Sequence, residues 1–390
     1  SLPPPSLVAP TPAPPSASPA EILRKLNFEM LSELGQGSFG IVFLCRSLAD
    51  KLKVAVKLVL DPSNAKEAMR EGQKLSNVDH KNIVRVRKVH DLDPILGLGT
   101  CALEMEVVPG GDLYRHLQAC RRRPDPRLPH ASVLRFSRQL LGVLVYLHGT
   151  KNWLHGDIKP QNILMDCMPV PADGSPVDYS SADIKLSDFG LAKVMDLQNS
   201  ARSIMLSNAS TVVGVMKGTM WYLSPEALQG ASSGYERTYS DDIWSACLVI
   251  YEMDTGLSLQ QLMTAPGAIK LEELLTKTSR ELLPLLASVL AVPDAASRCK
   301  SAAELLQKLD ASVDPLYIWE EYDATAGKYA CMHPAATFVL ETAFLANEPL
   351  AQLPLPPPLD LNFDIMALLS SATALGSATG RRSGAQRAIR

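Results

Sequence analysis

The chain has 390 residues, and 46% of them are hydrophobic, so it is long and apolar enough for two or three domains with buried cores. Its net charge of −3 lacks the strongly basic balance that nucleic-acid and membrane-surface binders carry, so we expect neither partner. The seven cysteines are scattered without a CxxC pair, which argues against a disulfide framework or zinc site and favours a reducing compartment, cytoplasmic or nuclear.

No targeting or membrane segment is predicted. No apolar run reaches the roughly 18 residues that a membrane-spanning helix needs. The first residues, SLPPPS, have neither the basic nor the apolar region of a signal peptide. The chain does not begin with Met, which fits a fragment of a longer protein.

Proline dominates the start of the chain. Residues 1–20 contain eight prolines and almost no large apolar side chains. Such a segment cannot bury enough surface to offset the entropy of ordering, so we predict disorder over residues 1–22. A PxxP pattern from Pro12 to Pro15 could bind a proline-recognising domain, although chance is the more frequent source of such a match in a low-complexity segment.

The next part of the chain predicts a small sheet with one helix. Residues 28–45 and 53–60 are strand-like runs on either side of a glycine turn. A helix is predicted over residues 63–75, and strands are predicted over 83–90 and 101–108.

Beyond Gly111 the pattern becomes helical. Residues 132–148 carry one apolar stripe at helical spacing, and residues 241–253 are apolar on nearly all sides, which indicates a buried helix. A late amphipathic helix is predicted over residues 301–310. A β-rich lobe followed by a helical lobe implies a cleft between them.

Glycines and one lysine form the first candidate site. Gly35, Gly37 and Gly40, in GQGSFGIV, let backbone N–H groups approach a bulky anion, although a lone pattern of this kind is more often a hairpin. Lys57 follows in an apolar strand, where a lysine needs a partner, and Glu71 on the next predicted helix could supply one. Two unrelated surface charges remain the alternative for this pair taken alone.

A polar loop forms the second candidate site. HGDIKPQN, residues 155–162, places Asp157, Lys159 and Asn162 between two apolar runs, and Asp188 follows in SDFG. An Asp can accept a hydroxyl proton, a Lys can balance phosphate charge, and Asn and Asp oxygens suit Mg²⁺. Each residue is unremarkable alone, so their joint order carries the prediction.

Taken together, these motifs over residues 28–310 resemble the eukaryotic protein kinase family. The resemblance implies an α+β, bilobal kinase fold with a β-rich N-lobe and a helical C-lobe. It implies ATP and Mg²⁺ as cofactors and protein substrates. Lys159 and Thr219 stand where serine/threonine kinases carry the same residues, so the resemblance favours phosphorylation of Ser and Thr.

The resemblance also assigns roles to residues. Asp157 would be the catalytic base with Lys159 beside it, and Asn162 and Asp188 would hold the metal. Asp242 would brace the loop, and Arg298 would pair with Glu226. Met105 would be the gatekeeper, and the residues that contact the nucleotide would be Gly35, Gly37, Gly40, Val42, Ala55, Lys57, Glu71, Glu106 and Val108.

Three features depart from the family pattern. Gly156 stands where the family usually has Arg, which makes the chain a non-RD type and predicts activity that depends little on phosphorylation of the loop from Asp188 to Glu226. Residues 166–183 lengthen a hairpin and predict a surface loop. The basic run at 120–127 predicts a solvated loop, with docking of acidic substrates as the alternative.

The C-terminal part, residues 315–390, resembles a WWE domain, which is a small α+β fold. The matching residues are Trp319, Leu340, Glu341, Phe363, Met366, Thr379, Gly380 and Arg390. The resemblance implies an ADP-ribose or ubiquitin-system partner, with Tyr329, Arg381 and Arg390 as candidate ligand contacts. Tyr329 and Leu368 differ from the Trp and Gln of ligand-binding members, and a helical kinase extension with a disordered basic tail is the alternative.

Two functions therefore remain open. The first is an active Ser/Thr kinase, favoured by the complete set of metal and phosphate ligands. The second is a pseudokinase scaffold that presents the C-terminal module in ubiquitin or ADP-ribose signalling.

Overall fold

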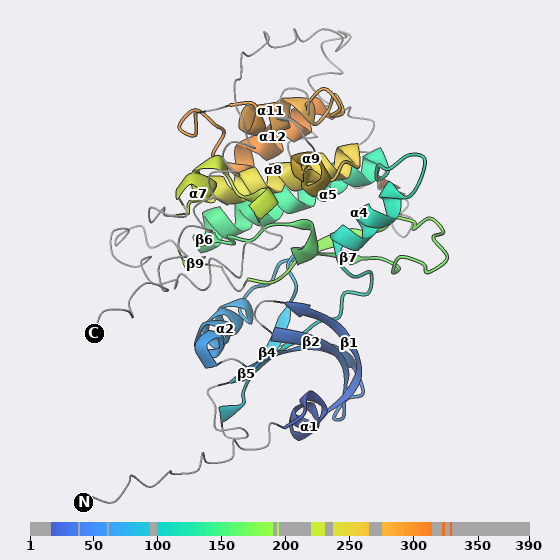
Figure 1. Ribbon diagram of the computed structural model, residues 1–390, viewed down its shortest axis with the longest axis vertical. Helices are drawn as coiled ribbons and strands as arrows, with labels where there is room; N and C mark the ends of the chain where they lie inside the picture. The colour runs from blue at the N-terminus through green and yellow to red at the C-terminus, as the bar shows by residue number, and fades with distance from the viewer. Residues whose placement is uncertain are drawn as a thin grey trace, which may run out of the picture. The chain divides into compact units, whose positions relative to one another are not determined.

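The protein is described by a computed structural model, which divides into two compact units (Figure 1). Unit 1 comprises residues 1–79 and 85–107, and unit 2 comprises residues 80–84 and 108–390. The structure describes residues 17–37, 40–60, 62–93, 100–189, 193–194, 220–230, 237–264, 275–292, 294–313, 322–323 and 328–329. Within these ranges, none of the helices has the length and apolar character required to traverse a lipid bilayer.

Unit 1 is built on a five-stranded antiparallel sheet with the order β1-β2-β3-β5-β4. The strands are β1 (Phe28–Gly37), β2 (Gly40–Ser47), β3 (Lys53–Val59), β4 (Val86–Asp91) and β5 (Cys101–Met105). Two helices accompany the sheet, α1 (Pro19–Lys25) and α2 (Pro62–Leu75). Helix α2 and the strands confirm the sequence prediction, except that the strand expected over residues 83–90 begins at Val86 and the strand expected over residues 101–108 ends at Met105.

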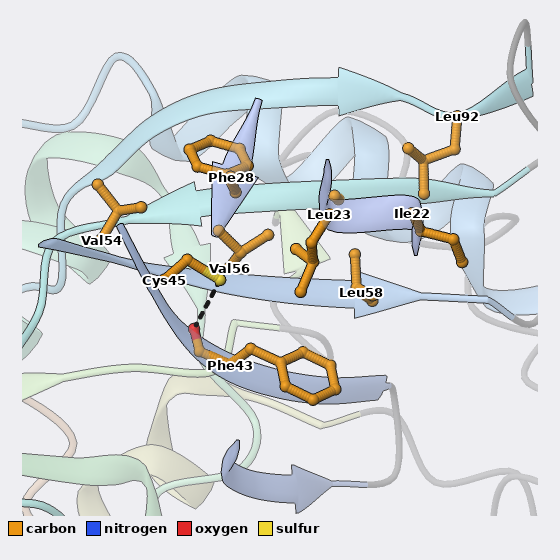
Figure 2. Close-up of a cluster of buried hydrophobic side chains, with 10 residues drawn as sticks. Ile22, Leu23, Phe28, Phe43, Cys45, Val54, Val56, Leu58 and Leu92 are labelled. Carbon is orange, nitrogen blue, oxygen red and sulfur yellow. Dashed lines mark hydrogen bonds between the residues drawn. The ribbon is translucent and has the colours of Figure 1, made fainter. Parts of the chain in front are cut away.

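Side chains of β3 alternate between the two faces of this sheet, as the pleat requires. On one face, Val54, Val56 and Leu58 lie in the cluster that contains Ile22 and Leu23 of α1 (Figure 2). On the other face, Val59 packs with Ala65 and Ala68 of α2 and with Cys101 of β5. Lys57 shares the face of Val59, because the two residues are two positions apart on one strand.

Helix α1 corrects the prediction that disorder extends to residue 22. Ser18 and Glu21 form a capping box, in which the Ser18 amide donates to Glu21 Oε2 at 2.8 Å and the Glu21 amide donates to Ser18 Oγ at 3.4 Å. Ile22 is 2% exposed and Leu23 is 0% exposed. The burial of these two side chains against the sheet offsets the ordering entropy that the composition argument assumed could not be recovered. Residues 1–16 lie outside the described residues.

Unit 2 is mainly helical. Its helices are α4 (Leu113–Arg121), α5 (His130–Val145), α7 (Pro225–Gly230), α8 (Tyr239–Thr255), α9 (Leu259–Thr264), α11 (Leu283–Leu290) and α12 (Ala302–Ser312), with short η1 (Tyr146–Lys151), η2 (Pro160–Asn162) and η3 (Met220–Tyr222) turns. Helix α8 is buried on nearly all sides, as the sequence predicted, and it packs beside α5 and α11 (Figure 1). It therefore provides a rigid base for the segments that contact it.

Unit 2 also contains two short antiparallel strand pairs, which contact α4, α5 and the η1 and η2 turns. Strand β6 (Trp153–Leu154) pairs with β9 (Lys193–Val194), and β7 (Ile163–Asp166) pairs with β8 (Asp183–Leu186). The segment 155–162 runs from β6 to β7, so both of its ends are held by strands.

The insertion between β7 and β8 is only partly the surface loop that the sequence predicted. Met168 is 76% exposed, but Tyr179 is only 2% exposed. Burial raises the pKa of Tyr179, so its hydroxyl stays protonated and can donate to Nδ1 of His116 at 3.0 Å. The Arg135 guanidinium donates to the carbonyls of Tyr179 and Ser180, which fastens the end of the insertion to α5.

The basic run at 120–127 also differs from the prediction of a solvated loop. Arg121 belongs to α4, and its guanidinium donates to the Gly256 carbonyl at 2.8 Å and to Glu252 Oε1 at 3.1 Å. This arginine therefore joins α4 to the end of α8. Arg122 and Arg127 are exposed, as expected of a solvated segment.

The WWE-like prediction falls almost entirely outside the described residues. The structure describes two short strands there, β10 (Tyr322–Asp323) and β11 (Lys328–Tyr329), which pair antiparallel. The other residues that carry the resemblance, from Trp319 to Arg390, lie outside them.

We predict that Leu23→Ala lowers the free energy of unfolding by about 2–5 kcal/mol, because it removes a fully buried side chain from the cluster beneath α1. Urea unfolding followed by circular dichroism measures the change. Arg24→Ala, an exposed neighbour on the same helix, is the control and should leave the stability nearly unchanged. Equal stability of the two variants would show that α1 does not pack on the sheet.

Candidate functional site

The 155–162 loop is anchored to α8 through one buried carboxylate. Asp242 Oδ2 accepts the His155 amide at 2.8 Å, and Asp242 Oδ1 accepts the Gly156 amide at 2.8 Å. His148 Nε2 lies 2.9 Å from Asp242 Oδ2. These contacts confirm the prediction that Asp242 braces the loop, and they satisfy backbone groups that have no access to water.

The surroundings of Asp242 keep it ionised. Burial by itself raises the pKa of a carboxyl group, and Asp242 is among the most buried residues of α8. The hydrogen bond from His148, the electrostatic interaction with the two neighbouring imidazole rings and the Gly156 amide together outweigh burial and hold the pKa of Asp242 below its usual value. The loop is therefore held by a fixed anion at neutral pH.

His155 connects the loop to the turn at residues 187–189. Its Nε2 lies 3.1 Å from the Ser187 carbonyl, and its Nδ1 lies 3.2 Å from the Asp157 amide nitrogen. A carbonyl can only accept and an amide N–H can only donate, so this geometry fits the tautomer with the proton on Nε2. The ring also meets Phe189 edge-on, with centroids 4.7 Å apart.

Asp157 has two oxygens in different situations. Its Oδ2 accepts from Lys159 Nζ at 2.8 Å and from Asn162 Nδ2 at 2.9 Å. Asn162 Nδ2 also donates to the Asp157 carbonyl at 2.8 Å. The other carboxylate oxygen, Asp157 Oδ1, is buried, and the described residues offer it no hydrogen-bond donor. One oxygen is thus fixed, while the other keeps its capacity to accept a proton or a hydrogen bond.

Asn162 and Asp188 are linked through the backbone. The Asn162 carbonyl accepts the Ser187 amide at 2.8 Å and the Ser187 hydroxyl at 3.0 Å. Asp188, the next residue, adopts a left-handed backbone with φ of 59°. The structure thus brings the two predicted metal ligands into neighbouring segments.

The donor types of Asn162 and Asp188 fit Mg²⁺. An amide oxygen and a carboxylate are hard ligands, and Mg²⁺ commonly takes one or two protein ligands together with phosphates and water. The described residues contain no group of three or more His, Cys, Asp or Glu side chains suited to holding a metal ion by themselves. The ordinary coordination of Mg²⁺ leaves the further positions beside two such ligands to phosphate oxygens and water.

The predicted nucleotide-contacting residues of unit 1 lie on its sheet. Gly35 and Gly37 end β1 and Gly40 begins β2. A Cβ at Gly40 would lie 2.1 Å from the Leu58 carbonyl oxygen, and its φ is 145°, so this position requires glycine. The pairs Val42–Lys57 and Ala55–Met105 are neighbours in the strand register.

The remaining predicted residues of this set are only partly described. Lys57 is 9% exposed. Glu71 lies on α2, and its predicted pairing with Lys57 lies outside what the structure describes. Glu106 follows β5, donating its amide to the Arg85 carbonyl at 3.0 Å and accepting the Arg85 amide through Oε1 at 2.8 Å. Val108 is half-buried and belongs to unit 2.

The predicted pair of Glu226 and Arg298 is confirmed. Arg298 Nη1 donates to Glu226 Oε2 at 2.8 Å, and its Nε donates to the Val292 carbonyl at 2.7 Å. The guanidinium lies over the Trp244 ring, 4.6 Å from its centroid. Arg298 therefore joins α7 to α8 and to the segment between α11 and α12. Thr219 lies outside the described residues, as do residues 195–218 of the loop from Asp188 to Glu226.

Sequence reasoning missed two contributors to the loop, His148 and Arg237. His148 contacts Asp242, and Arg237 Nη1 donates to the Gly156 carbonyl. Neither belongs to a motif quoted above, and each lies far in sequence from the residue that it contacts, 94 positions for His148 and 81 for Arg237. A basic residue just before the predicted start of the 241–253 helix was the available signal for Arg237.

The sequence of the chain is similar to one protein family model and to several known proteins. Residues 28–309 match the model of the protein kinase domain family. The chain is 31% identical over 233 residues to the probable serine/threonine-protein kinase nek3 of Dictyostelium discoideum, covering 59% of this chain and 18% of that protein. It is 30% identical over 236 residues to Aurora kinase A-A of Xenopus laevis, covering 59% of this chain and 48% of that protein.

A third relative extends the comparison. Protein kinase gsk31 of Schizosaccharomyces pombe is 31% identical over 252 residues, covering 64% of this chain and 56% of that protein. The match thus spans less than two thirds of each of these relatives.

We predict that Asp242→Asn destabilises the protein by about 3 kcal/mol at pH 7, because an amide in place of the carboxylate leaves a buried backbone N–H without an acceptor. The difference should shrink as the pH falls. The pKa of Asp242 is lowered below its ordinary 3.8, so its stabilisation is fully present above about pH 4 and is lost as the pH falls through the folded-state pKa.

Urea unfolding of both proteins between pH 7 and pH 3 measures this difference. Asp166→Asn, which changes an exposed carboxylate at the end of β7, is the matched control and should change stability little. A difference between parent and Asp242→Asn that stays constant down to pH 3 would contradict the prediction.

Proposed function

The chain belongs to the protein kinase domain family, and on this premise we propose that it transfers the γ-phosphoryl group of ATP to Ser and Thr hydroxyls of protein substrates. The observation that carries the proposal is the unequal state of the two Asp157 oxygens. Serine/threonine kinases among the relatives support the choice of hydroxyl.

Asp157 is proposed as the base that orients the substrate hydroxyl. Lys159 and Asn162 hold its Oδ2, so the carboxylate cannot rotate freely. Its Oδ1 remains an acceptor for the hydroxyl proton, and orientation of the oxygen nucleophile toward phosphorus requires such an acceptor. The fixed geometry supports the role because catalysis of phosphoryl transfer depends mainly on positioning.

Lys159 is proposed to offset negative charge on the transferred group. Its ammonium lies 2.8 Å from Asp157 Oδ2, so it stays beside the reacting hydroxyl. Asn162 Oδ1 and the Asp188 carboxylate are proposed to hold Mg²⁺, which when bound neutralises charge on the phosphates. The backbone link between Asn162 and Ser187 keeps these two ligands in adjacent segments.

The unit 1 residues are proposed to hold the nucleotide. Gly40 permits close backbone approach, and the amides of the β1–β2 hairpin suit phosphate oxygens. Lys57 would pair with the phosphates, aided by Glu71 on α2. The remaining contacts are assigned to Gly35, Gly37, Val42 and Ala55, and to the backbone of Glu106 and Val108.

The residue at 156 supports activity without loop phosphorylation. Glycine offers no cation for a phosphate on the 188–226 loop, so that phosphate has no partner at this position. The contacts of Asp242 and Arg237 fix the Gly156 peptide groups without any phosphate. We therefore propose that the enzyme is a non-RD kinase.

Residues 315–390 are proposed to form a WWE-like module for protein interaction. The support is the residue pattern from Trp319 to Arg390 and one short antiparallel pair, β10 with β11. The Tyr329 and Leu368 departures favour a protein or ubiquitin-system partner over ADP-ribose. A scaffold that presents this module without catalysis is the alternative function.

We predict that Asp157→Asn lowers kcat by at least about 100-fold, since a neutral amide cannot take a hydroxyl proton. Lys57→Met should also abolish most activity. The measurement is transfer of labelled phosphate from ATP to peptides that contain Ser, Thr or Tyr as the only acceptor, with Asp166→Asn as an active control.

Three results of this assay separate the hypotheses. Loss of activity in Asp157→Asn with a preference for Ser and Thr peptides supports the proposed function. Preference for the Tyr peptide would contradict the Ser/Thr assignment. Phosphate incorporation by Asp157→Asn equal to that of the parent would remove the catalytic role and favour the scaffold.

We predict that phosphatase treatment leaves at least about half of the activity, because Gly156 offers no cation that would have to pair with a phosphate on the 188–226 loop. Mass spectrometry should first confirm that the phosphate has been removed from the 188–226 loop. Activity that disappears on treatment and returns on incubation with ATP would contradict the non-RD proposal.

A further inference from the structure

The peptide group that joins Gly156 to Asp157 is held at both ends. Its N–H, which belongs to Asp157, lies 3.2 Å from His155 Nδ1. Its carbonyl oxygen, which belongs to Gly156, accepts a hydrogen bond from the Arg237 guanidinium. The orientation of this peptide plane sets φ of Asp157 and therefore the direction in which its Cα–Cβ bond points.

Gly156 is the residue that most needs such restraint. It has a φ of 79°, in the left-handed region, and it carries no side chain that could pack and fix its backbone. Glycine samples more backbone conformations than any other residue, so the adjacent peptide planes would rotate unless other groups hold them. Asp242 holds the plane before Gly156, and Arg237 holds the plane after it.

Both restraining groups come from the start of α8. Arg237 immediately precedes Thr238, the N-cap residue of α8, and Asp242 lies in the first turn. One group accepts a hydrogen bond and the other donates one, so α8 contacts the loop through charges of opposite sign. A charged donor on the carbonyl of a buried residue is stronger than a neutral one, which suits it to a restraining role.

We propose that Arg237 is a positioning residue that aims the Asp157 carboxylate by fixing the Gly156–Asp157 peptide plane. This role rests on the proposed function, in which Asp157 orients the substrate hydroxyl. Arg237 itself touches neither substrate nor phosphate in this account. It supplies from α8 the rigidity that a side chain at position 156 would otherwise help to provide.

Arg237→Met tests the proposal, because methionine keeps an apolar stem and loses every donor. We expect kcat to fall about 10-fold while the KM for ATP changes less than about 2-fold, since orientation of the base is altered and nucleotide contacts are not. Hydrogen exchange of the peptide covering residues 155–162 should become faster. Arg237→Lys, which restores one cationic donor, should recover part of the lost kcat.

Thr238→Ala is the matched control. It removes the side-chain cap of α8 next to Arg237 but leaves the Gly156 carbonyl contact in place. Its kcat should stay near that of the parent. An equal fall in kcat for Thr238→Ala and Arg237→Met would show that Arg237 acts only by holding the start of α8, and the proposal would be wrong.

Other results also decide the matter. Parent-like kcat in Arg237→Met, or a change confined to the KM for ATP, overturns the proposal. If Arg237→Met does not fold, Arg237→Lys is used in its place, and its kcat is expected to fall about 3-fold. In that case a kcat and a hydrogen-exchange rate equal to those of the parent overturn the proposal. The Asp157→Asn variant separates the test of the proposed function from the test of the Arg237 role. If its activity equals that of the parent, the proposed function is refuted, whatever the Arg237 variants show.

Discussion

The structure of the candidate site depends on the contact between one buried carboxylate and two consecutive backbone amides. The His155 and Gly156 N–H groups are buried and cannot bond to water, so an acceptor inside the protein has to satisfy them. Asp242 is that acceptor, and α8 places it there because the helix is packed on nearly all sides and cannot shift. The rest of the loop takes its shape from these two fixed points, since η2 and β7 follow within a few residues.

Because Asp242 fixes the backbone of the loop, the polar side chains that the loop carries can take different roles. Asp157 Oδ2 accepts hydrogen bonds from Lys159 and Asn162, and among the described residues Oδ1 has no donor, so it can accept a further hydrogen bond. His155 ties the same loop to the segment that carries Asp188. A small set of hydrogen bonds therefore determines both the direction of the proposed base and the placement of the proposed metal ligands. Such support by surrounding hydrogen bonds is typical of functional sites that are built on rigid elements.

Sequence reasoning identified the parts of this site that depend on residue type and order. The roles of Asp242 and of the Glu226–Arg298 pair were predictable through the resemblance to the kinase family, whose pattern places these residues at fixed positions. Most strands of unit 1 and the buried α8 followed from their apolar patterns. The roles of individual residues at the proposed nucleotide site remain predictions.

The contacts that were missed all join segments distant in the chain. Arg121 reaches Glu252 across 131 residues, and Arg237 reaches Gly156 across 81 residues, so no local pattern could reveal either pair. Tyr179 was hidden in a segment whose Pro, Gly and Ser content predicts exposure. In each case tertiary packing decided the outcome, and local composition did not.

Helix α1 has a practical consequence for where a shortened version of this chain should begin. The family match starts at Phe28, yet Ile22 and Leu23 cover side chains of the sheet, including Val56 and Leu58 (Figure 2). A protein shortened to the family boundary would expose this apolar face to solvent, and an uncovered patch on a sheet promotes self-association. Recombinant versions that retain residues from Ala17 onward keep the Ser18 cap together with the helix it starts, and they are the better starting material for biochemical work.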